Sequence, residues 1–281
     1  MAINNKQVLD DLAGEFRYVV TDMICRAGSG HLGGALSLVE IIISLYYRIM
    51  DLDPKNPKWA DRDRLVVSKG HAGPVLYTAL AYKGYFPKKW LKTLNDNGTK
   101  LPSHVDQIQT PGIDLTAGSL GQGLSGAIGI ALSNRMESRE NNVYCIIGDG
   151  ESNEGQIWEA ALFAGHRKLD NLIAITDYNK FQIDGSTDEI LSLEPLRSKW
   201  EAFNWEVFEM DGHDWDDIYN TLIKAGESTG KPKMIIAHTI KAKGCQVIEN
   251  RAESHNIKVP DNKAFETYMQ ALEKQNYTLP Y

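Results

Sequence analysis

Residues 143–179 read VYCIIGDGESNEGQIWEAALFAGHRKLDNLIAITDYN, and this stretch decides the fold. Its first apolar run is rich in β-branched residues and stops at Gly148-Asp149-Gly150, which is typical of a strand buried on both faces. A second apolar run, 172–176, ends at Asp177-Tyr178-Asn179 and is interpreted as a parallel neighbour of the first. A helical segment, 156–168, lies between them. The stretch predicts a βαβ unit within an α/β fold that has a parallel sheet and helices on both faces.

Polar side chains follow both predicted strands. Because βαβ crossovers are almost always right-handed, Asp149 and Asn179 are expected at the same sheet edge, where α/β proteins bind ligands. One carboxylate and one amide oxygen suit Mg²⁺ that is completed by ligand phosphates and water. The glycines beside Asp149 allow a diphosphate to approach closely. Gly-Asp-Gly alone is also compatible with a tight turn and a solvated aspartate, whereas the glycine spacing disfavours a dinucleotide fold.

The complete pattern is more specific than these three residues. It continues with Glu154-Gly155, Glu159-Ala160, Asn171-Leu172 and Asp177-Tyr178-Asn179-Lys180. It resembles the diphosphate and metal motif of thiamine-diphosphate enzymes, specifically the transketolase group. The resemblance implies the thiamine-diphosphate-binding fold, with thiamine diphosphate and Mg²⁺, or Ca²⁺ or Mn²⁺ as a substitute. The implied metal ligands are Asp149, Asn179 and the backbone oxygen of Phe181, and the implied cofactor contacts here are Asp149, Gly150, Glu154, Asn179 and Ile183.

Four histidines occupy loops or helix starts. His31 lies in the glycine-rich turn 27–34, His71 follows a short predicted strand at 64–68, and His104 and His255 lie in loops. From the residues alone, His31 is equally compatible with a helix cap and His104 with a loop residue without a function. The resemblance implies that all four bind substrate hydroxyls and move protons, because imidazole titrates close to neutral pH. It also implies that His71 and His255 lie beside the cofactor.

A second glycine-rich stretch, 116–125, reads TAGSLGQGLS and precedes a helix rich in small residues. Small residues let the backbone pack tightly on the sheet or on a neighbouring subunit, and close packing alone would explain them. The resemblance implies that Gly118, Ser119 and Leu120 lie near the aminopyrimidine of thiamine diphosphate.

The remaining pattern predicts elements on both sides of this stretch. Apolar spacing predicts helices at 8–26, within 36–50, through Leu76 and Leu80, and through Ile218 and Leu222, as well as a helical tail at 261–274. Further strands are predicted at 205–209 and 233–239. His166, His213 and His238 are interpreted as structural residues, with His238 in the core, and Cys145 is interpreted as core filling.

Length and charge restrict the class of protein. The chain has 281 residues, a formal net charge of −7 and a pI near 5.5. It can hold one large domain, 1–281, and its acidity argues against nucleic acid or an anionic membrane as partner. Its three cysteines are far apart in the sequence, so neither a disulfide framework nor a zinc site is expected. The N-terminus lacks a secretory signal, so a cytoplasmic location is expected.

The resemblance stops where the first transketolase domain stops. The pyrimidine-binding and C-terminal domains of that family, including a glutamate that ionises the cofactor, are expected on a partner chain. The expected assembly is a two-plus-two complex that transfers a two-carbon ketol unit from a ketose to an aldose, while the chain alone is inactive. Glu154, and with it Glu159, resemble family acids near the dimer interface.

Three histidine contexts depart from the family pattern. Leu32 follows His31 where proline is usual, Ser103 and Val105 flank His104, and Asn256 follows His255. Because these residues flank expected substrate contacts, we expect an unusual sugar, such as a branched or sulfonated ketose.

Two other interpretations are compatible with part of these motifs. The α subunit of a 2-oxo acid dehydrogenase first component also has G-D-G, N-E-G and a partner chain, but the histidine motifs and the 116–125 stretch suit hydroxylated sugars better. Deoxyxylulose phosphate synthase is another alternative, but its corresponding segments read differently. A non-catalytic interaction module would not need Asp149, Asn179 or the four histidines.

Overall fold

The structure is a computed structural model that describes residues 3–273 and 277–281. Within these residues, five parallel strands form the central sheet in the order β2-β3-β4-β6-β5. The predicted βαβ unit is confirmed, because the strands at both ends of the 143–179 stretch pair side by side and Gly148 lies opposite Asp177. The strands are β2 (Arg64–Val67), β3 (Val143–Gly148), β4 (Leu172–Tyr178), β6 (Lys233–His238) and β5 (Glu206–Asp211).

The apolar runs of the strands supply two separate cores. On β3, Tyr144 and Ile146 belong to the core on one face, whereas Val143, Cys145 and Ile147 belong to the core on the other. This alternation follows from the two-residue period of a strand. Both faces are buried, which explains why the sequence of the strand is apolar throughout. Cys145 is core filling, as predicted.

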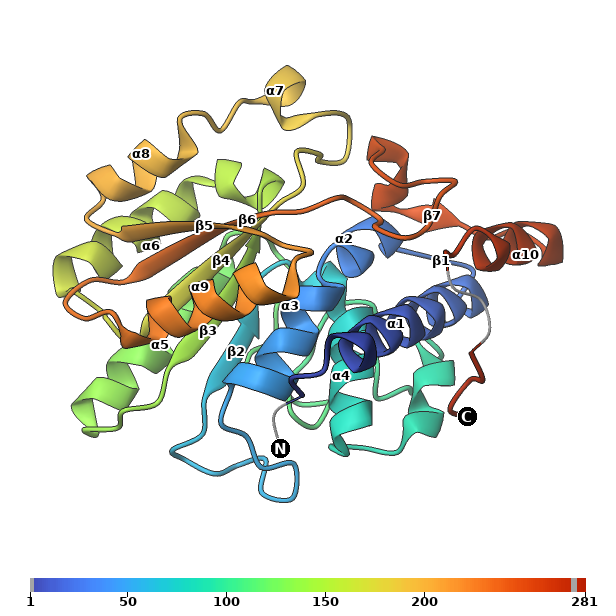
Figure 1. Cartoon of the computed structure of the whole chain (residues 1–281), viewed down its shortest axis with the longest axis horizontal. Helices are drawn as coiled ribbons and strands as arrows, with labels where there is room; N and C mark the ends of the chain where they lie inside the picture. The colour runs from blue at the N-terminus through green and yellow to red at the C-terminus, as the bar shows by residue number, and fades with distance from the viewer. Residues whose placement is uncertain (1–2, 274–276) are drawn as a thin grey trace.

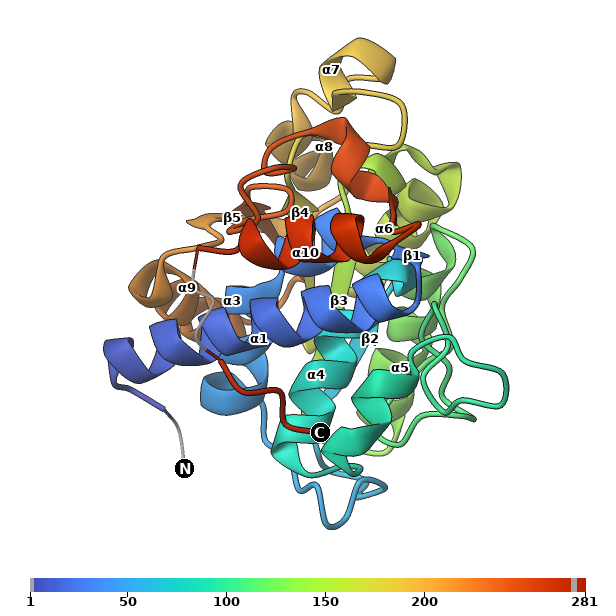
Figure 2. The ribbon, with the colours of Figure 1, turned by 90° about the vertical axis from the view of Figure 1, so that its right-hand side faces the viewer.

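Helices cover both faces of the sheet (Figure 1). The first core is completed by α1 (Lys6–Arg26), α2 (Leu32–Leu36), α3 (Val39–Ser44), α4 (Gly73–Lys83) and α9 (Trp215–Glu227). The second is completed by α5 (Gln122–Met136), α6 (Gly155–Arg167) and α8 (Leu196–Ala202). Helix α10 (Asn262–Gln270) packs along α1 (Figure 2), and α7 (Thr187–Ile190) lies in the loop after β4.

A small second sheet brings distant segments together. Strand β1 (Ser29–Gly30) pairs antiparallel with β7 (Ile257–Lys258), with Gly30 opposite Ile257. His31 directly follows β1 and His255 precedes β7 by two residues. The pairing therefore brings the two histidine loops together, although His31 and His255 are 224 positions apart in the sequence.

The predicted helices and strands are present with small shifts at their ends. The helix predicted within 36–50 begins at Val39 and ends in a π-helical turn, η1 (Leu45–Ile49). The predicted tail helix ends at Gln270, and Lys274 lies outside the described residues. Short 3-10 turns complete the chain at η2 (Gly70–Ala72), η3 (Lys88–Thr93), η4 (Gly150–Asn153) and η5 (Ala252–His255).

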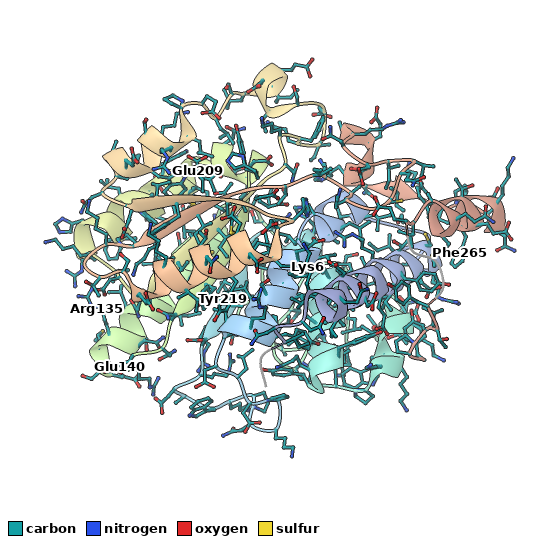
Figure 3. All side chains as sticks on the ribbon, in the orientation of Figure 1. Lys6, Arg135, Glu140, Glu209, Tyr219 and Phe265 are labelled. Carbon is teal, nitrogen blue, oxygen red and sulfur yellow. The ribbon has the colours of Figure 1, made fainter. Side chains whose placement is uncertain are left out.

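The prediction that His238 lies in the core is wrong. His238 is the last residue of β6, and 47% of its side chain is exposed. Its Nε2 lies 2.9 Å from a carboxylate oxygen of Glu209 on the edge strand β5. Glu209 is labelled in Figure 3. The apolar run continues up to Ala237, but His238 emerges at the strand end, beyond the buried core.

Close packing of α6 yields a stability prediction. A Cβ added at Gly165 would lie 1.9 Å from the backbone oxygen of Phe203, so Gly165→Ala must push the end of α8 away. We expect a loss of about 1–3 kcal/mol in the free energy of unfolding, measured by urea denaturation. Gly226→Ala in α9 is the matched control, because no atom lies within 4 Å of its added Cβ. Equal stability of Gly165→Ala and the wild type would contradict the described packing.

Candidate active site

A cavity of about 370 Å³ opens at the carboxyl ends of β3 and β4. Asp149 and Asn179, which were predicted to face one crevice, both line this cavity, because the carboxyl ends of parallel strands lie at the same edge of the sheet. Ser119, also predicted here, is exposed and is not among the lining residues. The other predicted residues all line the cavity: His31, His71, His104, Gly118, Leu120, Asp149, Gly150, Glu154, Asn179, Phe181, Ile183 and His255.

The four histidines form one cluster. The imidazole centroid of His31 lies 5.0 Å from that of His71, 5.6 Å from that of His104 and 5.2 Å from that of His255. His71 lies 5.3 Å from His255. The β1–β7 pairing, the turn after β2 and the loop at 104 supply these side chains. A substrate in the cavity therefore meets several imidazoles at once.

Burial keeps these imidazoles neutral. It lowers the pKa of His31 to about 4, with further lowering by His104 and Lys241, and that of His255 to about 3, with further lowering by Lys241, His31 and Lys69. Burial also lowers the pKa of His71 and His104. At neutral pH each ring therefore has one nitrogen that donates a hydrogen bond and one that accepts it. Such rings suit hydroxyl groups, which donate and accept in the same way.

Asp149 and Asn179 are prepared for a cation. Burial and the nearby carboxylate of Asp177 raise the pKa of Asp149 to about 7, so a cation beside it would be stabilising. The Asn179 amide nitrogen donates to Asp177 at 3.1 Å, which directs its oxygen away from that carboxylate. Among the described residues, His, Cys, Asp and Glu form no group of three or more that could hold a metal. One carboxylate and one amide oxygen are ligands that Mg²⁺ accepts when a backbone oxygen, a diphosphate and water complete its shell.

Polar groups around the metal position also fit a diphosphate. The half-buried Gln182 side chain lines the cavity, and its buried amide nitrogen has no hydrogen-bond partner among the described residues. An acceptor oxygen from a ligand would satisfy this donor. The Lys241 ammonium lies 3.3 Å from the backbone oxygen of Phe181 and 3.4 Å from that of Gln182. The cavity thus holds cationic and N–H groups that can bind an anion.

Two lysines of the cavity were missed by the sequence reasoning. Lys69 is 2% exposed, forms a buried ion pair with Asp177 and donates to the backbone oxygen of Gly34 at 3.0 Å. Lys241 is also 2% exposed, and burial lowers its pKa to about 8. Lysines are rarely buried without a partner, and nothing in the local sequence marks Lys69 or Lys241 as buried. For Lys69, its position between a predicted strand and His71 was the available signal that it lies near the site.

Glu151 was also missed, although it lies within the decisive stretch. Its buried carboxylate accepts hydrogen bonds from the backbone N–H groups of Gly121 at 2.8 Å and Gly148 at 3.0 Å, and from the Ser68 hydroxyl. It therefore joins the 116–125 turn to the Gly-Asp-Gly turn. Glu154 is exposed at the cavity rim, and Glu159 is exposed on α6.

Comparisons with known proteins agree with this geometry. Residues 9–274 match the family model described as transketolase, thiamine diphosphate binding domain. The chain belongs to the transketolase family. This match favours a transketolase over the 2-oxo acid dehydrogenase alternative, and it supports thiamine diphosphate as the cofactor that the cavity fits.

Transketolase relatives include single subunits and longer chains. The 6-deoxy-6-sulfo-D-fructose transketolase subunit SqwG of Clostridium sp. (strain MSTE9) is 55% identical over 90% of this chain and 92% of its own length. A subunit of the apulose-4-phosphate transketolase of Phocaeicola vulgatus is 39% identical over 92% of this chain and 93% of its own length. Transketolase from Campylobacter jejuni has a TM-score of 0.91 and 35% identity, and this chain spans 44% of it.

The chain therefore corresponds in length to the relatives that are named as subunits, and to less than half of the solved transketolases that it resembles. Of the helices within the described residues, none is both long and apolar enough to cross a membrane.

The Lys69–Asp177 pair yields a second stability prediction. Lys69→Met leaves the Asp177 carboxylate buried without its cation, so we expect a loss of about 3–5 kcal/mol in the free energy of unfolding. Arg197→Met is the control, because Arg197 pairs with Glu201 and Glu209 at the surface, where a loss below about 1 kcal/mol is expected. Equal effects of both substitutions in urea denaturation would contradict the role assigned to the buried pair.

Proposed function

We propose that this chain and a partner subunit together transfer a two-carbon ketol unit from a sulfonated ketose to an aldose acceptor. The single observation that carries the proposal is one cavity lined by four neutral histidines together with Asp149 and Asn179. The 55% identity to a subunit named for 6-deoxy-6-sulfo-D-fructose favours a sulfonated donor over a branched one, since the subunits named for apulose 4-phosphate are 39% and 43% identical.

One group of cavity residues would hold the cofactor and its metal, and the other group, the histidines, would bind the sugar. Asp149, Asn179 and the Phe181 carbonyl would hold Mg²⁺, and Gln182 and Lys241 would face the diphosphate of the cofactor. Thiamine diphosphate, when bound, supplies the carbanion chemistry that the side chains lack. The exposed side chain of Ile183 lines the same cavity and would pack on the cofactor.

The histidines would bind the sugar and carry protons. Breaking the bond between C2 and C3 of a ketose requires the C3 hydroxyl to lose its proton, while the departing aldehyde keeps the oxygen. A neutral imidazole can take that proton at its free nitrogen and return it when the acceptor aldehyde forms the new bond. The lowered pKa values of His31, His71, His104 and His255 keep the free nitrogen available at neutral pH.

Exposed apolar side chains support a partner subunit. Leu162 and Phe163 on α6 are 60% and 45% exposed, and Ile183 at the cavity is 64% exposed. Such residues suit an interface with another chain. The relatives named as subunits have the length of this chain, whereas the single-chain transketolases extend well beyond it. We propose a two-plus-two complex, with Glu154 and Glu159 near the contact between its halves and the pyrimidine-binding and C-terminal domains on the partner.

Co-expression with the adjacent-gene product tests this proposal. We expect ketol transfer only from the purified complex, and only with both thiamine diphosphate and Mg²⁺. Asp149→Ala should reduce turnover at least about 100-fold because a metal ligand is lost. Asp184→Ala should leave turnover unchanged, because Asp184 is an exposed acid in the loop after β4. Normal turnover by this chain alone, or by the Asp149→Ala complex, would refute the proposal.

The donor sugar gives a separate prediction. With one aldose acceptor, kcat/KM of the complex should be at least about tenfold higher for 6-deoxy-6-sulfo-D-fructose than for xylulose 5-phosphate or apulose 4-phosphate. Each polar group that a poorly matched sugar leaves without a hydrogen-bond partner costs binding free energy that corresponds to about a tenfold change. A clear preference for xylulose 5-phosphate would exclude a specialised donor. A preference for apulose 4-phosphate would assign a branched donor in place of the sulfonated one.

A further inference from the structure

The loop after β6 presents Lys241 to the cavity. Lys241 lies in the 239–244 loop, and its ammonium contacts the backbone oxygens of Phe181 and Gln182. A flexible lysine side chain points in one direction only if its backbone is held in place. His213 and Arg17, from two other segments of the chain, contact the backbone on either side of Lys241, and Glu40 from a third segment joins these two side chains.

His213 holds the backbone before Lys241. The N–H group of Ile240 donates to Nε2 of His213 at 2.8 Å, so this nitrogen carries no proton. The proton of the neutral ring is therefore on Nδ1, which lies 3.1 Å from a Glu40 carboxylate oxygen and donates to it. His213 lies in the turn between β5 and α9, and only 12% of its side chain is exposed.

Arg17 holds the backbone after Lys241. Its Nη2 lies 2.7 and 2.9 Å from the two oxygens of Glu40, and its Nε donates to the backbone oxygen of Lys243 at 2.8 Å. Burial raises the pKa of Glu40, but Arg17 and His213 outweigh it and lower the pKa to about 2. The Glu40 carboxylate is thus ionised and accepts from both side chains. We call Arg17, Glu40 and His213 the loop anchor.

The loop anchor lies outside the cavity, because none of its three side chains is among the lining residues. It joins α1, α3 and the β5–α9 turn to the backbone on both sides of one cavity lysine. Other contacts hold the loop as well, since Ala242 donates to Gly33 at 3.0 Å and Asn250 donates to the Lys241 carbonyl at 2.8 Å. Removing one member of the anchor should therefore displace Lys241 without unfolding the loop.

We propose that the loop anchor is a positioning device that places the Lys241 ammonium against the diphosphate of the cofactor. This inference rests on the proposed function, because it assumes that thiamine diphosphate occupies the cavity. The diphosphate is the expected partner of Lys241, since the ammonium lies beside Phe181, whose carbonyl is the third metal ligand of the proposed site.

A double-mutant cycle on the reconstituted complex tests the loop anchor. The dissociation constant of thiamine diphosphate is measured by equilibrium dialysis with saturating Mg²⁺ and no sugar. Lys241→Met should weaken binding about 10- to 100-fold, and His213→Ala should weaken it by a similar or smaller factor. In the Lys241→Met background, His213→Ala should change the constant by less than about twofold, because the residue through which it acts is gone.

Two further variants separate positioning from a general structural role. His213→Gln can accept from Ile240 and donate to Glu40, so it should restore most of the affinity that His213→Ala loses. His238→Ala, an exposed histidine at the end of β6, should leave the affinity unchanged. Urea denaturation of each variant checks that it is folded. If His213→Ala is not folded, the test rests on His213→Gln.

The outcomes distinguish the two proposals. If the wild-type complex binds no thiamine diphosphate, the proposed function fails. If the wild type binds it but His213→Ala weakens binding by the same factor with and without Lys241, the loop anchor does not act through Lys241 and the inference is overturned. Full affinity of the His213→Ala complex would overturn it as well.

Discussion

Asp177 has a fully buried carboxylate near the end of β4, and four side chains donate to it. Its partners are the Ser37 hydroxyl, the Lys69 ammonium, the Asn179 amide and the Thr239 hydroxyl. Burial raises the pKa of this group, but Lys69 and the other donors outweigh it and lower the pKa. A buried ionised carboxylate is tolerated only with such partners. It therefore joins the break before α3, the ends of β2 and β6, and the expected metal ligand Asn179.

The chemistry of the cavity follows from this arrangement of charges. Lys69 is largely balanced by Asp177, so Lys241 can meet an anionic ligand, while Asp149 can meet a metal. The histidines, whose pKa values are lowered by burial, stay neutral beside them. The cavity can hence combine metal, diphosphate and hydroxyl binding without excess charge. That combination suits a sugar attached to a diphosphate cofactor.

Local pattern predicted most of the fold and most of the cavity. The βαβ unit around Asp149 was visible because an apolar run and a polar end follow each other in the sequence. Lys69, Lys241 and Glu151 were missed because their burial depends on partners that lie 30 or more positions away, such as Gly121 and Asp177. The core assignment of His238 was wrong for another reason, because the sequence does not reveal where β6 leaves the core.

Carbon tracing tests the central claim most directly. The complex would be supplied with a ketose donor labelled with ¹³C at C1 and C2, an aldose acceptor, thiamine diphosphate and Mg²⁺, and the products followed by NMR. We predict that both labels appear, still bonded to each other, at C1 and C2 of the new ketose, and only when both subunits and both cofactors are present. Label that is released as carbon dioxide, or that stays in the donor, would contradict the claim that this chain is half of a ketol-transferring enzyme.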